Sequence, residues 1–149
     1  MGLSVLCGMK QNPLIGTWKL LSWELRDEAG HVSYPFGPDA VGYLTYTEDG
    51  HMSVIITTAR RAPSSASDLL GGSVDEKAAA AETCVAYCGT YRVQGSKVVI
   101  HVDASLFPNW TESEQVRVFH IDGHSLTMSI ASSTWSGKQQ TARLLWEPV

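Results

Sequence analysis

Short segments rich in β-branched and aromatic residues recur about every ten residues along this chain, with turn signals between them. Asp49-Gly50 and Asp122-Gly123 each join two such segments, and Asp-Gly is a strong hairpin signal. The pattern predicts eight strands, over residues 14–26, 40–47, 51–58, 89–94, 97–105, 113–121, 125–132 and 138–147. Because short turns join most of them, the strands should form an antiparallel meander.

An eight-stranded meander has two exposed sheet edges unless the sheet closes on itself. Eight strands is about the number that closes around one small ligand. We therefore predict an all-β fold, an eight-stranded antiparallel up-and-down barrel. A sandwich of two sheets is the alternative, but few connections here are long enough for its Greek-key crossovers.

One segment breaks the β pattern. Ser73 and Glu76 have the spacing of a capping box, and a run of alanines follows them. This predicts one helix over about residues 74–87, which should cap one mouth of the barrel together with the Ser-rich loop before it. Cys84 and Cys88 would lie across the end of that helix. With Cys7 they make an odd number without the spacing of a disulfide framework, so we expect reduced thiols.

Composition excludes several classes of function. The chain has 149 residues, one domain's worth, which we divide into an N-terminal extension (1–12) and a barrel domain (13–149). Its net charge of −4 and lack of a basic run argue against nucleic acid or an anionic membrane as partner. No apolar stretch approaches the roughly 20 residues of a membrane span, and no secretory leader is recognisable. We expect a cytoplasmic protein, and leave a homodimer open.

The start of the first predicted strand carries a motif. Gly16-Thr17-Trp18 resembles the Gly-x-Trp of lipocalins and the wider calycin group, in which the Trp closes the barrel floor and a late-strand Arg covers its ring. Arg143, on the last strand, is the residue that would make this cation–π contact. The resemblance therefore agrees with the barrel that the strand pattern predicts.

Further segments narrow the resemblance to the small bacterial and fungal lipocalin-like domain family. They are residues 12–18 (NPLIGTW), 34–37 (YPFG), 42–46 (GYLTY), 49–52 (DGHM), 87–91 (YCGTY) and 105–110 (SLFPNW). The resemblance implies the fold and leaves the function open: some lipocalin-like proteins of natural-product pathways look like cyclases or isomerases, and others like carriers.

We expect no cofactor and no metal. In the haem-binding relatives with a ten-stranded barrel the opening pattern is Gly-x-Trp-x-Gly-x-Gly, whereas Lys19, Leu20 and Leu21 follow Trp18 here. The chain has no nucleophile elbow, no glycine-rich phosphate loop and no His-x-x-x-His pair. If the protein is an enzyme, it should be a cofactor-free isomerase, cyclase or dehydratase that acts through proton-transfer groups.

Two strands carry the candidate catalytic groups. On 97–105, His101 and Asp103 share one face and the apolar Val98, Ile100 and Val102 share the other, and the sequence leaves open which face is the lumen. If the polar face is lumenal, His101 is a candidate acid or base, with Asp103 or Tyr91 as second proton-transfer group.

On 113–121, an inward Arg117 would be an unpaired buried charge. Either Glu24 or a carbonyl, enol or anionic oxygen of a ligand could satisfy it. In an enzyme, Arg117 would stabilise developing oxyanion charge.

Two main hypotheses of function follow. The first is a module that binds a small hydrophobic molecule in the lumen, with Tyr46, Met52, Tyr91, Trp110 and Glu24 as candidate ligand-binding residues. The second is the isomerase or cyclase in the same pocket. A third hypothesis is a scaffold with a filled interior. A cavity below about 100 Å³ would favour it, because ligand pockets usually measure about 300–1,000 Å³.

Overall fold

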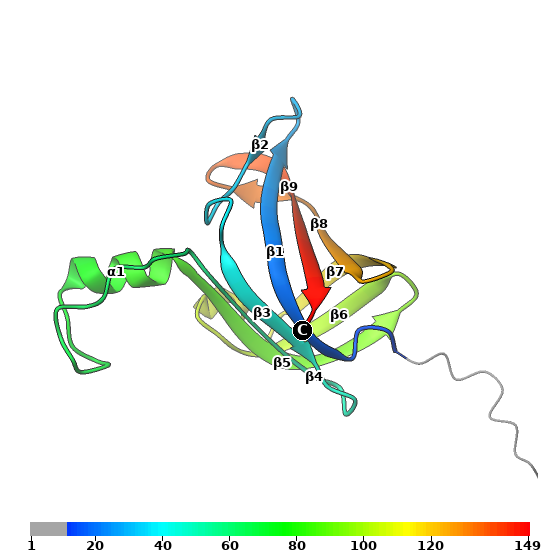
Figure 1. The fold of residues 1–149 in the computed structure, drawn as a ribbon, viewed down its shortest axis with the longest axis horizontal. Helices are drawn as coiled ribbons and strands as arrows, with labels where there is room; N and C mark the ends of the chain where they lie inside the picture. Colours follow the sequence, from blue (N-terminus) through cyan, green and yellow to red (C-terminus); the bar gives the residue numbers. More distant parts are fainter. Residues whose placement is uncertain (1–11) are drawn as a thin grey trace, which may run out of the picture.

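The computed structural model describes residues 12–149 and shows a closed antiparallel barrel (Figure 1). Its elements, in chain order, are β1 (Gly16–Asp27), β2 (Val32–Ser33), β3 (Val41–Tyr46), β4 (His51–Thr57), α1 (Val74–Glu82), β5 (Cys84–Gln94), β6 (Lys97–Ser105), the 3₁₀ turn η1 (Pro108–Trp110), β7 (Glu114–Asp122), β8 (Ser125–Trp135) and β9 (Lys138–Pro148). Neighbouring strands pair in sequence order from β3 to β9, and β1 pairs with both β3 and β9.

The β1–β9 pairing closes the sheet. It runs from Trp18 opposite Pro148 to Asp27 opposite Gln140, so the first and last strands leave no free edge along most of their length. The two-residue β2 only extends one end of β1. The predicted eight-stranded up-and-down barrel is therefore confirmed, and the sandwich alternative is wrong.

Three bulges shift the alternation of side chains. They lie between Leu20 and Ser22 on β1, between Cys88 and Gly89 on β5, and between Ile130 and Ser133 on β8. At Gly89 the strands approach so closely that a Cβ would lie 1.8 Å from the carbonyl oxygen of His101. Only glycine fits at this point, because any side chain would push β5 and β6 apart.

The closed end of the barrel is built around Trp18. Its ring is buried and its Nε1 donates to the carbonyl oxygen of Leu14 at 2.9 Å. The expected cation–π contact with Arg143 is wrong: Arg143 is exposed on β9 and lies opposite Glu24, because the inward positions of that strand are Ala142 and Leu144. Trp18 is held by packing and by one hydrogen bond.

The segment before β1 is tied to the same end. Asn12 accepts a hydrogen bond from the Leu14 backbone N–H at 3.0 Å, and its Nδ2 donates to the Tyr91 hydroxyl at 2.8 Å. The rest of the extension predicted over residues 1–12, with Cys7, lies outside the described residues.

Residues 58–83 form an arm that carries α1 and projects from the barrel, as Figure 1 shows. A hydrogen bond from Thr58 N to Thr83 O (3.2 Å) closes its base. The predicted capping box is present, since Ser73 Oγ accepts from Glu76 N and Glu76 Oε1 accepts from Ser73 N.

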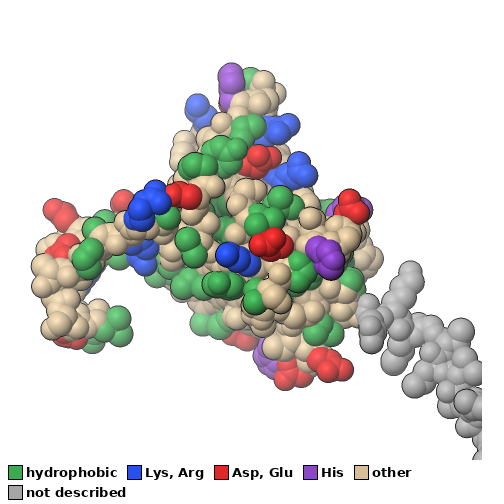
Figure 2. Space-filling model, viewed as in Figure 1, with side chains coloured by type: hydrophobic (Ala, Val, Ile, Leu, Met, Phe, Trp, Pro, Cys, Tyr) green, Lys and Arg blue, Asp and Glu red, His purple; other side chains and the backbone are tan. Residues whose placement is uncertain are grey.

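Two details of the predicted helix are wrong. It ends at Glu82, because Cys84 to Tyr87 pair with β4 as the start of β5, which also places both thiols on a strand. It lies beside the mouth rather than across it, since none of its residues is buried and it has no apolar face to press on the barrel. Figure 2 shows hydrophobic side chains toward the end of the arm, where Leu69, Leu70 and Val74 are exposed.

No helix among residues 12–149 is both long enough and apolar enough to cross a membrane.

Candidate functional site

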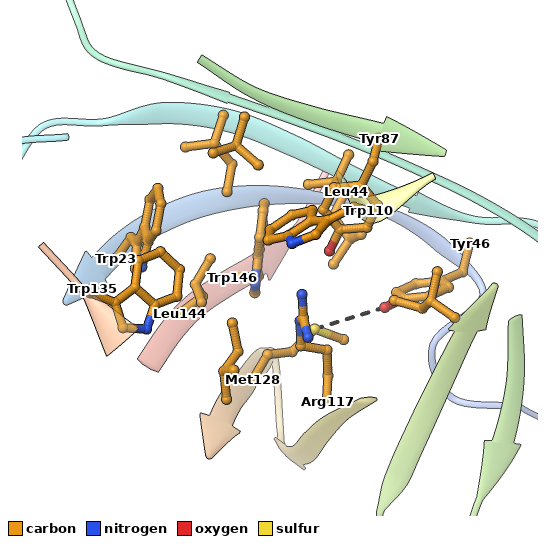
Figure 3. Close-up of a pocket in the computed structure, with 15 residues that line it drawn as sticks. Trp23, Leu44, Tyr46, Tyr87, Trp110, Arg117, Met128, Trp135, Leu144 and Trp146 are labelled. Carbon is orange, nitrogen blue, oxygen red and sulfur yellow. Dashed lines mark hydrogen bonds between the residues drawn. The ribbon is translucent and has the colours of Figure 1, made fainter. Parts of the chain in front are cut away.

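The barrel encloses an aromatic chamber, which we call the inner chamber, of about 50 Å³. Every one of the eight barrel strands contributes to its wall, so it is the lumen. Its lining residues are Trp23, Leu44, Tyr46, Val54, Ile56, Val85, Tyr87, Ile100, Trp110, Arg117, Met128, Ile130, Trp135, Leu144 and Trp146. Figure 3 shows Arg117 directed into the space beside Trp146 and Tyr46, with Trp23 and Trp135 farther along. The wall is apolar except for the Arg117 guanidinium, the hydroxyls of Tyr46 and Tyr87, and the indole N–H groups.

A wider outer chamber of about 660 Å³ lies at the mouth. It shares five wall residues with the inner chamber, namely Val85, Trp110, Arg117, Ile130 and Trp135. The inner chamber alone is below the size expected of a ligand pocket. It is also below the limit of about 100 Å³ that would favour a filled interior, so the inner chamber by itself fits the scaffold hypothesis. Only together with the adjoining outer chamber does the space reach the range of about 300–1,000 Å³ that ligand pockets usually have.

Among residues 12–149, Arg117 is the one charged residue in the wall of the inner chamber. Its side chain is only 6% exposed, and its Nη1 donates to the carbonyl oxygen of Val116 at 3.1 Å. No carboxylate of residues 12–149 forms an ion pair with it. Residues 1–11 contain neither Asp nor Glu, so they hold no carboxylate side chain that could pair with it.

Two tryptophans of the chamber have unpartnered N–H groups. The Nε1 atoms of Trp23 and Trp146 are buried without a hydrogen-bond acceptor among residues 12–149. Trp135 differs, because its Nε1 donates to Ser133 Oγ at 2.7 Å. Trp23 is fixed by edge contacts with Phe36 and Trp135, at centroid distances of 4.8 and 5.7 Å. A buried donor without a partner costs about 1–3 kcal/mol, so these two groups are unusual.

Tyr46 is one of two tyrosines that line the inner chamber, and Tyr87 is the other. The Tyr46 hydroxyl donates a hydrogen bond to Met128 Sδ at 3.8 Å, drawn as a dashed line in Figure 3. Burial raises its pKa well above the usual value of 10.0, and the nearby Tyr87 adds to the shift while the charge of Arg117 opposes it. The hydroxyl is therefore protonated at neutral pH and supplies no negative charge to Arg117.

The structure places His101 and Asp103 on the outside of the barrel. The inward face of β6 is Val98, Ile100 and Val102, all buried, because they pack into the lumen as a continuous apolar stripe. His101 Nε2 lies 3.6 Å from Asp103 Oδ1 and 3.7 Å from Glu112 Oε2, in a partly solvated cluster away from both chambers. The lumenal role considered for this pair is therefore wrong.

Glu24 is also outside the chambers, and it is not the partner of Arg117. Its carboxylate lies 3.7 Å from Arg26 Nη2. The cause is the bulge between Leu20 and Ser22: without it Glu24 would share the inward parity of Trp18 and Leu20, but the bulge turns Trp23 inward instead.

The remaining candidates divide into two groups. Tyr46 and Trp110 line the inner chamber, together with Arg117. Met52 and Tyr91 do not line either chamber. Met52 is part of the buried core, and the Tyr91 hydroxyl donates to Thr47 O at 2.7 Å while its ring packs edge-on against Tyr46.

Sequence reasoning did not single out Trp23, Trp135 and Trp146 as chamber residues. Only Trp146 could have been found, since it shares inward parity with Ala142 and Leu144 on an unbulged strand. Trp23 and Trp135 both follow bulges, which a periodic pattern does not reveal.

A closed eight-stranded meander with a buried Gly-x-Trp tryptophan at one end and an aromatic lumen at the other defines a small calycin-like barrel. Comparison of sequences gives the particular family. The model of the lipocalin-like domain matches residues 15–149, and the chain belongs to this family.

Three known proteins are among those similar to this chain. The 4'-hydroxy-3'-methoxypropiophenone carrier protein of Aspergillus oryzae is 34% identical over 88 residues, which are 53% of this chain and 79% of that protein. A lipocalin-like protein from Bacteroides uniformis matches with a TM-score of 0.47 and 13% identity, over 91% of this chain and 98% of its own. An uncharacterised protein from Bacteroides eggerthii matches with a TM-score of 0.44 and 11% identity, over 91% and 99%.

Proposed function

We propose that this protein binds a small hydrophobic molecule in its lumen and carries it without chemical change. The observation that supports this most directly is the pair of adjoining chambers, in which apolar and aromatic walls lead from a wide mouth to an enclosed end. A ligand would place its apolar body in the outer chamber and its narrow end between Trp146, Tyr46 and Arg117.

The Aspergillus oryzae relative supports the same role. It is named as the carrier of a small aromatic ketone, and we extend the carrier role to this chain. Aromatic walls suit such a cargo, since edge-to-face contacts add about 0.5–1.5 kcal/mol to the burial of each ring. The alternative, an isomerase, cyclase or dehydratase, keeps Arg117 in the lumen but loses its proton-transfer pair, because His101 and Asp103 lie outside the lumen.

The experiment uses N-phenyl-1-naphthylamine, a neutral apolar dye whose fluorescence rises when it leaves water. We expect saturable enhancement with the wild-type protein. Val85→Phe should weaken dye binding about tenfold or more, because Val85 lies in the wall that the two chambers share and a bulkier ring there fills the passage. Ile130→Phe, at a second position in the wall that the two chambers share, should also weaken dye binding.

The matched control is Ile55→Phe. Ile55 neighbours Ile56 on β4 but is exposed on the outer face, so the same addition of a ring should leave dye affinity within about twofold. Circular dichroism checks that each variant is folded. Absence of dye binding to the wild type, or equal binding by Val85→Phe, Ile130→Phe and Ile55→Phe, would contradict a lumenal site.

A further inference from the structure

We propose that the molecule bound across the two chambers is an aromatic phenol or enol whose oxygen enters the inner chamber and is held as an oxyanion against Arg117, with the indole N–H groups of Trp146 and Trp23 as further donors. This inference rests on the proposed function and specifies its ligand. It follows from the hydrogen-bonding groups that line the chamber and from the absence of a carboxylate among its described lining residues.

The first step is the unfilled capacity of Arg117. A guanidinium has five N–H donors in a rigid planar fork, and the described residues accept one hydrogen bond from it, through Val116 O. A buried cation needs a negative or strongly polar partner. Every carboxylate that forms an ion pair among residues 12–149 does so with a basic side chain other than Arg117, and residues 1–11 have no acidic side chain.

The second step is that the fully buried, unpartnered nitrogen atoms of the chamber are donors as well, while the Tyr87 hydroxyl in the same wall can donate or accept. Trp23 is 4% exposed and Trp146 1% exposed, and the Nε1 of each lacks an acceptor among the described residues. Both line the same chamber as Arg117. Figure 3 shows the Trp146 ring beside the Arg117 side chain, with Trp23 farther along the chamber. Three donors around one apolar space match a molecule that supplies acceptor oxygens.

The third step concerns charge. The Tyr46 hydroxyl stays protonated, since burial raises its pKa, so it does not neutralise Arg117. An oxyanion of the ligand would do so. A phenolate or enolate suits this chamber, because its charge is spread over a flat conjugated system that packs between aromatic rings, while its oxygen meets the guanidinium in a charge-assisted hydrogen bond.

The probe for this inference is 4-nitrophenol, because its phenolate absorbs visible light and its neutral form does not. Absorbance is titrated against pH with and without excess protein. If the oxyanion is preferred, the apparent pKa of the bound probe should fall by about one unit or more, which corresponds to phenolate binding at least about tenfold tighter than phenol. 4-Nitroanisole, the neutral methyl ether of similar shape, should bind at least about tenfold more weakly than the phenolate.

Arg117→Met should abolish the pKa shift of the bound probe. Arg117→Gln also removes the positive charge and should likewise abolish the pKa shift. The control is Arg143→Met, which removes an exposed arginine from the outer face of β9 and should keep the full shift. Trp146→Phe, which removes one donor, should reduce the shift in part.

The outcomes separate the two proposals. If 4-nitroanisole binds and the pKa of 4-nitrophenol stays the same or rises, the oxyanion inference is overturned and the hydrophobic site stands. If the full shift persists in Arg117→Met and Arg117→Gln, the assignment to Arg117 is overturned. If neither probe binds and N-phenyl-1-naphthylamine shows no saturable signal, the proposed function fails and the inference fails with it. The wild-type titration does not depend on the folding of any variant.

Discussion

Replacing Arg117 by methionine should make the ligand-free protein more stable. In the structure the guanidinium is almost fully buried among aromatic and aliphatic side chains and has one hydrogen bond, to Val116 O. Folding therefore removes a charge from water without a matching counter-charge. Methionine has a similar length, fills irregular apolar spaces well and brings no charge into the lumen.

The size of the effect follows from two opposing contributions. Burying an uncompensated ion costs several kcal/mol even after relaxation of the surroundings. The hydrogen bond that the variant loses is worth about 1.5–3 kcal/mol, because its donor is charged. We expect the free energy of unfolding to rise by about 1–3 kcal/mol, which is roughly 2–12 °C in Tm for a domain of this size.

Urea unfolding followed by tryptophan fluorescence measures this difference, since four of the five tryptophans line the inner chamber. The midpoint should rise in Arg117→Met while the m-value stays constant. Arg143→Met, at an exposed position, should change stability by less than about 0.5 kcal/mol. A loss of more than about 1 kcal/mol in Arg117→Met would refute the reasoning, because it would mean that the barrel itself satisfies the guanidinium.

Two further predictions concern the scaffold around the site. Gly89→Ala should destabilise the protein by about 2 kcal/mol or more in the same urea assay, because its Cβ would collide with the carbonyl of His101, whereas Cys88→Ala at the exposed neighbouring position should have little effect. In the arm, hydrogen bonds from the Ser73 and Ser65 backbone N–H groups lower the pKa of Glu76 from 4.5 to about 2. A depressed pKa means that this contribution is fully present above pH 4.5 and is lost as the pH falls toward about 2. Hydrogen exchange of residues 58–83 should therefore accelerate over that interval, and an exchange rate that stays constant with pH after correction for intrinsic chemistry would contradict the capping role.

The regular strands were predictable because their signals are local. Asp49-Gly50 and Asp122-Gly123 mark the hairpins at which β4 and β8 begin, and the structure has strands on both sides of each. Closure was predictable from the strand number, since a meander of this size hides its edges by forming a barrel. The helix start was equally clear from Ser73 and Glu76.

The contents of the lumen were less predictable, because they depend on bulges and on pairing between distant strands. The bulge after Leu20 decides that Trp23, and not Glu24, faces inward. Cys84 to Tyr87 continue the helical pattern of the alanine run, but pairing with β4 overrides local propensity. On β6 both faces alternate regularly, and only contact with the core shows that Ile100 is inside and His101 outside.

The pairing of β1 with β9 also determines the stage of folding at which the ligand-binding site is formed. These strands come from opposite ends of the domain, so the contacts that close the barrel are among the most distant in sequence, and such contacts form late and slowly. Before closure the inner chamber lacks the β9 wall that carries Leu144 and Trp146. Ligand binding should consequently appear in the last kinetic phase of refolding, after most of the strand signal has recovered, and a ligand present at that moment would act as a template for closure.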